Sequence, residues 1–478
     1  MLPERLSGVD HAGDGGDLLA AMLTGGIPHP TGYPTYMILG RLFQLLPIGS
    51  PYFRGSLFSA ASAALAVGLI YLWIKSETRQ FGWLGVLAGL AGAVLLGVSP
   101  LFWSQAVIVE VYALEILFLA LALWWFHLLA YYKPSRGVKI LLSVLSVSLG
   151  LAAGDHVTIL LLAPVCLYGV YLGRKRGVEK RFLAAQAGFV LIGLMVYLYL
   201  PLQARNYPPI NWGNPQNWQG FIWELSGRPY QRLLFDLPWP QLSERVSAWA
   251  RLLVDQFGIV GLLFGLLGLV QAELIDKPTR FVLGWIFVVY TLFSLGYNTS
   301  DSMVYLLPAF LVFAVWIGLG VLYILQLKWR QYRVGAFVAA GLAVSIVIRS
   351  PSIYDQIDPR RDASPANYAE KYLLNMPENA LVLTSADDDS FPLWYYHFGL
   401  GWRSDVRVIV LPLTQFEWYQ VTIQHVYPDL VADPILDGAE NWGEDLVKLN
   451  PGRAVCRSSL DNQAENGVAV ICSTKTNP

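Results

Sequence analysis

The stretch Val304–Gln326, VYLLPAFLVFAVWIGLGVLYILQ, contains no charged side chain. A helix rises about 1.5 Å per residue, so a segment of this length can cross the roughly 30 Å hydrocarbon core of a bilayer. The stretch therefore predicts a membrane-spanning helix, and it decides the class of the fold.

Similar apolar runs recur along the whole chain. Of the 478 residues, 55% are hydrophobic and only 14% are charged, and the mean hydropathy is +0.46. Soluble domains carry about 25% charged residues, so this chain belongs in a bilayer. The formal net charge of −1 gives no indication of a nucleic-acid partner. We predict about ten spans, at 55–74, 82–99, 111–131, 139–154, 157–173, 183–201, 257–272, 281–297, 304–326 and 334–349.

Lysine and arginine are concentrated in alternate loops, which predicts the orientation. The loops 100–110, 155–156 and 298–303 contain neither residue. By the positive-inside rule the basic loops are cytoplasmic, and residues 1–54, the loop 202–256 and everything after about 350 lie outside. The basic loops contain Lys75 and Arg79; Lys133, Arg136 and Lys139; Arg174, Lys175, Arg176, Lys180 and Arg181; Lys277 and Arg280; and Lys328, Arg330 and Arg333.

The amino terminus conflicts with this orientation, because no signal peptide or earlier span delivers residues 1–54 to the outside. We expect that a first transmembrane helix is missing from this sequence. Post-translational translocation of a short tail is the alternative.

Two domains are predicted, a multi-span membrane domain at 1–350 and a soluble extracytoplasmic α/β domain at 351–478. The second has a helical pattern at Ser364–Pro377, followed by four strand-like runs. Cys456 and Cys472 fall in the last two runs, and both a disulfide and two reduced thiols are compatible with the sequence. The strand-like runs are Ala380–Ser385, Val406–Pro412, Arg453–Ser459 and Gly467–Thr474.

Ionisable groups gather on the outer side of the predicted membrane. Asp14 and Asp17 share one face if GDLLAAMLTGG is helical, and His29 follows in the tight HPTGYP turn with Tyr33. A helix cap and a solvated acid are the plain alternative for the two aspartates. The following stretch, TYMILGRLFQLLP, contains Arg41 and suits an interfacial helix.

Other outer loops add further polar groups. Glu110 enters a span with Tyr112 beside it, and Asp155 and His156 form a very short turn. Arg205 follows a span end, where its guanidinium can meet an anionic headgroup or simply snorkel. Intramembrane and interfacial charges are expensive, so this gathering predicts a functional site. Trp212, Trp218 and Trp223 suit interfacial anchoring or a platform for a sugar or lipid, and Asp387, Asp388 and Asp389 suit an acidic turn or a hard-cation site.

Several of these motifs together resemble a known family. They are DGGDLLAA, IPHPTGYPTYMILGRLF, FWSQAVIVEVYAL, YLYLPLQARNYPPINWGNP and ADDDSFPLWYY, in this order. The chain resembles the family of multi-span proteins that includes the eukaryotic transmembrane protein O-mannosyltransferase, over nearly its whole length. That family is similar to the GT-C glycosyltransferases, polytopic enzymes that take a sugar from a polyprenyl-phosphate carrier and act on the outer or lumenal side.

The resemblance implies roles for individual residues. It implies that Asp14 is the catalytic base or a ligand of a divalent cation such as Mg²⁺ or Mn²⁺, and that Glu110 and Asp17 support catalysis. Asp17 stands where the family more often has glutamate, and Asp155 stands where asparagine usually precedes the histidine. Substrate contacts are expected from His29, Tyr33, Arg41, Tyr112, His156, Arg205 and Trp212.

The function expected from the resemblance is transfer of a sugar, with mannose as one candidate, to an extracytoplasmic protein or glycan acceptor. A carboxylate would accept the acceptor proton, and a cation would stabilise the departing phosphate. The alternative is a transporter or flippase of a lipid-linked or small polar substrate, which would place acids near mid-bilayer on broken helices of two related halves. A non-catalytic scaffold for cell-surface polymers is a third interpretation.

Overall fold

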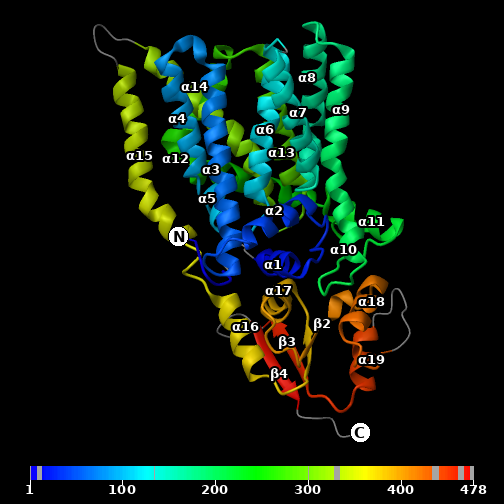
Figure 1. Ribbon diagram of the computed structural model, residues 1–478. Helices are drawn as coiled ribbons and strands as arrows, with labels where there is room; N and C mark the ends of the chain where they lie inside the picture. Colours follow the sequence, from blue (N-terminus) through cyan, green and yellow to red (C-terminus); the bar gives the residue numbers. More distant parts are fainter. Residues whose placement is uncertain are drawn as a thin grey trace.

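The computed structural model describes residues 2–7, 13–133, 135–299, 301–327, 334–432, 441–460 and 468–473. A bundle of long helices forms a membrane region, and a small mixed sheet lies beyond one end of it (Figure 1). Within the described ranges, eight helical segments are long and apolar enough to cross a membrane, or nine if a pair bent by 63° counts as one span. The predicted polytopic helical membrane fold is confirmed.

The spans follow the predicted segments closely. The bent pair replaces the predicted span 82–99. Helix α15 (Val334–Ile357) covers the tenth predicted segment but is not among the candidate spans of the described residues, so that span stays a prediction. The other spans are α3 (Pro51–Glu77), α6 (Tyr112–Tyr131), α7 (Arg136–Ala153), η3 with α8 (Val157–Leu162, Ala163–Lys175), α9 with η4 and α10 (Lys180–Leu194, Met195–Leu198, Tyr199–Ala204), α12 (Trp239–Val270), α13 (Lys277–Gly296), and η7 with α14 (Ser302–Leu306, Leu307–Gln326); the bent pair is α4 (Trp83–Gly97) and α5 (Pro100–Val107).

Helix α12 corrects the predicted loop 202–256. The helix begins at Trp239, well before the predicted span at 257, and changes direction at Gly258, whose φ is +68°. Its first half, SERVSAWARLLVDQ, is too polar for a hydropathy signal but contains no helix breaker. A helix that continues past the membrane into water looks like a loop to hydropathy alone.

Helices α6 and α14 form the centre of the membrane region. About 83% and 89% of their most apolar windows are buried, against 28–44% for the other spans. The surrounding helices therefore expose apolar faces that suit lipid.

Close helix contacts rely on glycine. On α7 and α9, Gly150 and Gly193 face each other, and a Cβ on Gly193 would lie 2.2 Å from the carbonyl oxygen of Val147. On α12, a Cβ on Gly268 would lie 1.7 Å from the carbonyl oxygen of Trp316. Small residues let backbones approach where no hydrophobic effect drives helix association.

Short helices gather at one end of the bundle, beside the sheet (Figure 1). Helix α1 (Gly15–Thr24) follows Asp14 and ends at Gly25, whose φ of +73° suits glycine. A turn closed by Gly32 N–H donating to the carbonyl of His29 (3.0 Å) leads into α2 (Pro34–Gln44). The predicted short helix, turn and second helix are confirmed. Helix α11 (Trp218–Leu225) and η5 (Arg228–Leu233) lie at the same end.

The C-terminal sheet has strand order β2-β1-β3-β4, and its strands match the four predicted strand-like runs, except that β3 ends one residue beyond its run. Strand β1 is parallel to β2 and β3, and β3 is antiparallel to β4. Gly467 and Thr474, the ends of the last predicted run, lie outside the described residues. The elements are β1 (Leu381–Thr384), β2 (Arg407–Val410), β3 (Val455–Leu460), β4 (Val468–Ser473), α16 (Ser364–Asn375), α17 (Asp387–Trp394), η8 (Tyr395–Gly399), η9 (Leu411–Leu413), α18 (Glu417–Val426) and α19 (Trp442–Leu449).

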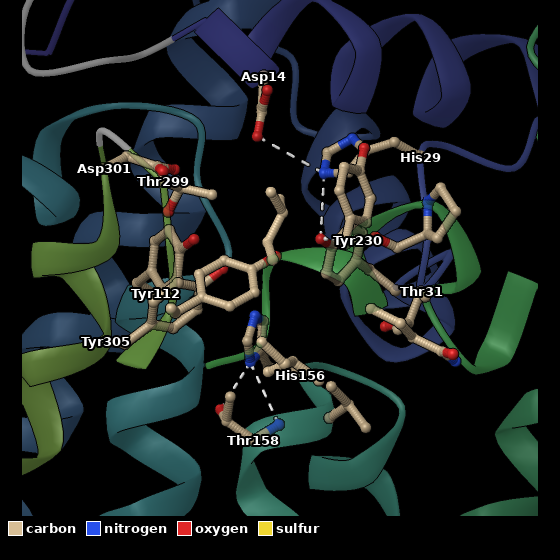
Figure 2. A pocket seen from close by; sticks show the side chains of 18 of the residues that line it. Asp14, His29, Thr31, Tyr112, His156, Thr158, Tyr230, Thr299, Asp301 and Tyr305 are labelled. Atoms are coloured by element: carbon tan, nitrogen blue, oxygen red, sulfur yellow. Dashed lines mark hydrogen bonds and ion pairs between the residues drawn. The ribbon is translucent and has the colours of Figure 1, made fainter. Parts of the chain in front are cut away.

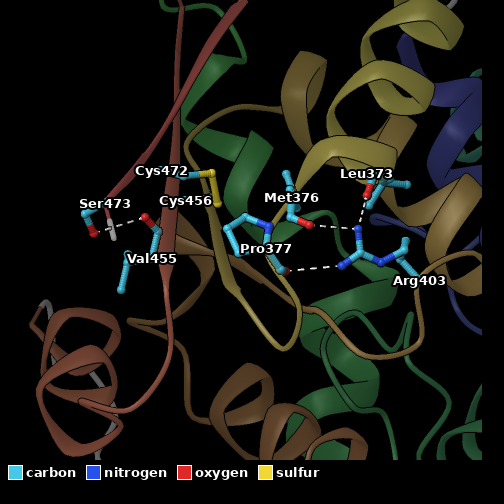
Figure 3. Close-up of a disulfide and its surroundings, with 8 residues drawn as sticks. All are labelled: Leu373, Met376, Pro377, Arg403, Val455, Cys456, Cys472 and Ser473. Carbon is cyan, nitrogen blue, oxygen red and sulfur yellow. Dashed lines mark hydrogen bonds between the residues drawn. A yellow bond between two sulfur atoms is a disulfide. The ribbon is translucent and has the colours of Figure 1, made fainter. Parts of the chain in front are cut away.

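Two features of this region resolve open interpretations. Cys456 and Cys472 are opposite each other on β3 and β4 and form a disulfide (Figure 3). Asp387, Asp388 and Asp389 form the first turn of α17 instead of a surface turn. Figure 3 also shows Arg403, whose guanidinium donates to the carbonyls of Leu373 (2.6 Å) and Met376 (3.0 Å) and so fixes the end of α16.

The predicted basic loops share one end of the bundle. The connections α6–α7, α8–α9 and α12–α13, which belong to these loops, lie at the end opposite to α1 and the sheet (Figure 1). Lys328, Arg330 and Arg333 lie outside the described residues. The proposed domain boundary at 350 falls within α15 and stays a prediction.

The glycine contact between α7 and α9 gives a stability prediction. We expect Gly193→Ala to lower the thermal midpoint of the purified protein, because the added methyl group meets the α7 backbone; overpacking of this kind costs about 1–3 kcal/mol. Gly188→Ala on the same helix is the matched control, since its Cβ meets nothing within 4 Å. Equal midpoints for the two variants, measured by fluorescence-detected size-exclusion after heating, would show that the contact is not tight.

Candidate active site

A cavity of about 690 Å³ lies where the membrane region meets the C-terminal region. Its walls come from seven places in the chain: the start of α1, the turn before α2, the start of α6, η3, η5, the segment 293–305 and the start of α17. Figure 2 shows Asp14 and His29 on one side, with His156 and Thr158 across the space from them. The cavity is therefore built from elements far apart in sequence.

Asp17 fixes His29 in one orientation. The Asp17 carboxylate is fully buried, and its Oδ2 accepts from the backbone N–H of His29 (2.8 Å) and from its Nδ1 (2.7 Å). The indole Nε1 of Trp212 donates to Oδ1 of Asp17 (3.3 Å). Because Asp17 holds Nδ1, the other ring nitrogen of His29 faces the cavity.

The exposed edge of His29 meets two further groups. Its Nε2 lies 3.0 Å from the hydroxyl of Tyr33 and 3.5 Å from Oδ2 of Asp14. The Tyr33 hydroxyl donates to the carbonyl of Pro30 (3.3 Å), which leaves its oxygen free to accept from Nε2–H. Asp14, His29 and Asp17 thus form one contiguous chain from the cavity into the protein interior.

Charges around His29 keep it protonated. Burial is the largest single influence and disfavours the imidazolium, but the charge of Asp14, the hydrogen bond and charge of Asp17, and the charge of Glu110 outweigh it and raise the pKa of His29 to about 10. Enclosure raises the pKa of Asp14, as do Asp17, Asp301 and Asp388, against the opposing charge of His29. A raised pKa makes Asp14 a stronger base once it is ionised.

The second histidine has the opposite character. His156 Nδ1 lies 2.7 Å from the hydroxyl of Thr158, which in turn donates to Glu115 (2.5 Å). Burial, with a smaller effect from the charge of His29, lowers the pKa of His156 to about 4. His156 is therefore neutral at physiological pH, and the cavity has one charged and one neutral imidazole.

The predicted residues fall into three groups. Five line the cavity: Asp14, His29, Tyr33, Tyr112 and His156. Asp17 and Trp212 lie directly behind His29, and Glu110 is buried, where burial and then the charge of Asp14 raise its pKa well above the ordinary range. Arg41 and Arg205 are exposed and do not belong to the lining, so their contact with substrate stays a prediction.

Several lining residues were not among the predicted site residues. Asp301 and Tyr305 come from the outer loop 298–303 and the start of the next span, and Tyr230 comes from η5. Asp387 and Asp388 also face the cavity, and burial followed by the charge of Asp14 raises the pKa of Asp387 to about 6. The acidic run ADDDSFP was the available signal, but its position in the fold was not visible in the sequence.

Arg245 fastens the wall that carries Asp301. Its guanidinium donates to the hydroxyl of Ser302 (2.8 Å) and to the carbonyls of Tyr297 (2.7 Å) and Thr299 (3.2 Å). Tyr297, Thr299 and Asp301 all line the cavity. One side chain from α12 thus holds the loop that forms this wall.

Part of the cavity lining is apolar, and some of it comes from the start of a span. Leu160 is 60% exposed and Leu234 is 41% exposed. Leu160 and Leu161 lie in the first turns of the span Val157–Lys175. The apolar lining comprises Val157, Leu160, Leu161, Leu233, Leu234 and Phe293.

The acids around the cavity do not form a metal-binding group. Among the described residues, no set of three histidine, cysteine, aspartate or glutamate side chains has a spacing that could hold a metal ion. The predicted divalent cation at Asp14 is therefore not supported by a ligand set, and it stays a hypothesis.

Comparisons with known proteins agree with the sequence resemblance. The family described as "Protein O-mannosyl-transferase TMEM260 N-terminal domain" matches residues 14–179, and "TMEM260-associated domain 2" matches residues 365–429. Protein O-mannosyl-transferase tmem260 of Dictyostelium discoideum is 23% identical over 86% of this chain and 55% of its own length. Its counterpart from Mus musculus is 25% identical over 87% of this chain and 61% of its own length. The chain spans little more than half the length of these relatives.

The fold has a counterpart among solved structures. ArnT from Cupriavidus metallidurans bound to undecaprenyl phosphate matches with a TM-score of 0.61 and 14% identity, over 98% of this chain and 95% of that one. This likeness shows a GT-C-like fold. With both family matches in the predicted order, the chain is similar to the TMEM260 protein O-mannosyltransferase family, as its motifs indicate.

Proposed function

We propose that the protein is a GT-C-type glycosyltransferase that moves a sugar from a polyprenyl-phosphate carrier to an extracytoplasmic protein or glycan acceptor. The observation that carries the proposal is one cavity that combines polar and apolar lining residues. Asp14, His29 and His156 supply polar groups, and Leu160 and Leu161, in the first turns of a span, supply apolar ones. A polyprenyl-phosphate sugar likewise combines a polar head with an apolar tail.

The proposed reaction uses Asp14 as general base. Its carboxylate accepts the proton of the acceptor hydroxyl while the acceptor oxygen attacks the anomeric carbon. The bond from that carbon to the phosphate oxygen breaks, and the phosphate leaves with the electron pair, so the anomeric configuration inverts. Mannose is the sugar that the names of the relatives favour.

His29 is the proposed counter-charge for the leaving phosphate. No lysine or arginine is among the lining residues within the described part of the chain, whereas His29 is protonated. Its charge is available without reorganisation because Asp17 already fixes the ring. The hydroxyls of Tyr112 and Tyr305 are further polar groups around the same space.

Two likenesses support the donor class. ArnT, which has the same fold, was solved with undecaprenyl phosphate, and the curated relatives are named as protein O-mannosyl-transferases. Glu110 is proposed to support the site from behind the cavity, where its side chain is buried. Arg41 and Arg205 are proposed to attract anionic headgroups at the membrane surface. We derive no step that requires a metal.

Removal of the base should stop sugar transfer. We expect Asp14→Asn to reduce turnover of a polyprenyl-phosphate sugar about 10²–10⁴-fold in reconstituted membranes, while the thermal midpoint is kept. Asp276→Asn makes the same substitution at an exposed helix cap on the opposite end and should leave turnover unchanged. If Asp14→Asn retains near-normal transfer, the base lies elsewhere; parallel reactions with EDTA test the cation hypothesis.

The pH profile should report the pairing of Asp17 with His29. Because His29 is protonated below its raised pKa, kcat/KM should fall as the pH rises through about 10. Asp17→Asn removes a charge and a strong hydrogen-bond acceptor, so the alkaline limb should move to lower pH. Trp212→Phe, which removes one weaker hydrogen bond to Asp17, should move the limb less. An unmoved limb in Asp17→Asn would exclude His29 as the counter-charge.

The site end of the molecule is proposed to face the extracytoplasmic side. The protein has three cysteines, and Cys456 and Cys472 are protected from maleimide by their disulfide. Cys166→Ser therefore removes the remaining thiol. In that variant, Asn206→Cys and Glu378→Cys should be labelled by an impermeant maleimide in intact cells. Lys180→Cys, at the opposite end, should be labelled only after lysis. The reverse pattern would invert the orientation.

A further inference from the structure

A second hollow, of about 300 Å³, lies between α11 and the start of α18. We call it the aromatic hollow; none of its described lining residues also lines the first cavity. It is at the sheet end of the bundle, away from the spans, where α11 approaches the C-terminal region (Figure 1). Its lining includes Gln219, Trp223, Arg228, Phe416, Glu417 and Trp418.

Three half-buried rings form a corner in this hollow. Phe416 and Trp418 are nearly parallel, with ring centroids 5.9 Å apart and planes at 16°. Trp223 stands across them at 5.7 Å and 68° from Phe416, and at 5.5 Å and 56° from Trp418. The corner joins α11 to α18, so both parts of the chain must be in place to form it.

Unpaired polar groups surround the rings. Gln219, Arg228 and Glu417 are exposed, and no hydrogen bond or ion pair of their side chains occurs within the described structure. The indole Nε1 of Trp418 is buried and has no acceptor among the described residues. The groups that a ligand in the hollow can reach are therefore the exposed side chains of Gln219, Arg228 and Glu417.

The chemistry of the hollow favours one ligand class. A pyranose ring has apolar C–H faces, which suit aromatic rings, and hydroxyl edges that both donate and accept. Hydrogen-bond donors and acceptors are both supplied here by Gln219, Arg228 and Glu417. The charges of Arg228 and Glu417 cancel, which disfavours binding of a free anion. The neighbouring backbone is helical, so it offers no strand edge to an extended peptide.

We propose that the aromatic hollow is a second carbohydrate site, which binds one pyranoside ring on the aqueous side of the protein. Trp212 separates it from the first cavity: its ring lies 5.6 Å from that of Trp418, and its Nε1 donates to Asp17. A sugar in the hollow is therefore one indole away from the residue that holds His29. The idea that the aromatic hollow holds a sugar of the acceptor or product rests on the proposed function. Binding of a pyranoside in the hollow does not depend on that function.

The test measures binding of methyl α-D-mannopyranoside without any donor. The full chain is placed in lipid nanodiscs, because glycoside detergents carry competing pyranosides, and titrated by saturation-transfer-difference NMR. We expect saturable binding that weakens at least tenfold in the Arg228→Ala/Glu417→Gln double variant. Both side chains are exposed and unpaired, so the variant should fold. Glu244→Gln/Arg251→Ala, at exposed positions of α12, is the control with the same charge changes and should bind normally.

Each other outcome overturns the proposal. These outcomes are the absence of saturable binding, binding unaffected by the double variant, or a serine- and threonine-containing peptide that binds in place of the sugar and is lost in the double variant. Failure of sugar transfer with intact pyranoside binding would instead contradict the proposed function alone.

Discussion

The buried carboxylate of Asp17 is the constraint on which the site depends. It accepts two hydrogen bonds from the same residue, His29, one from the backbone and one from the ring. An ionised carboxylate is costly to bury unless such bonds are made, so the turn between α1 and α2 and the orientation of the imidazole are determined together. The position of Tyr33 and the contact with Asp14 follow from that orientation.

The two histidines of the cavity differ in protonation state because their surroundings differ. His29 stands among carboxylates and is charged, whereas His156, across the same space, has a neutral hydroxyl as its close partner and is neutral. The cavity therefore contains one cationic imidazole, which can only donate hydrogen bonds, and one neutral imidazole, which can donate one and accept one. Groups whose environments push their pKa values apart commonly divide acid and base roles.

The sequence predicted much of this arrangement because membrane topology is a strong constraint. Once the basic loops determine which ends share a side, Asp14, His29, Tyr112 and His156 must lie at the same end, and the structure places all four on one cavity. Membrane topology does not determine where a residue lies across the plane of the membrane. Arg205 therefore lies at the same end of the bundle as these residues but does not line the cavity.

The remaining features depend on tertiary contacts that leave no local signal. Asp301, Asp387 and Tyr305 reach the cavity only after distant elements pack. The pairing of Cys456 with Cys472 depends on the register of β3 and β4, which spacing alone does not determine. Hydropathy located the apolar half of α12 and missed the half that continues into water.

The contribution of α17 to the cavity has a consequence for biosynthesis. Asp387, Asp388 and Phe391 close a space whose other walls are complete by residue 305. A ribosome must therefore translate some eighty further residues, including α15 and β1, after the last wall of the membrane region has been inserted. Throughout that interval the cavity of the nascent membrane bundle lacks one wall, and it is finished only when the chain beyond the membrane has folded back onto it.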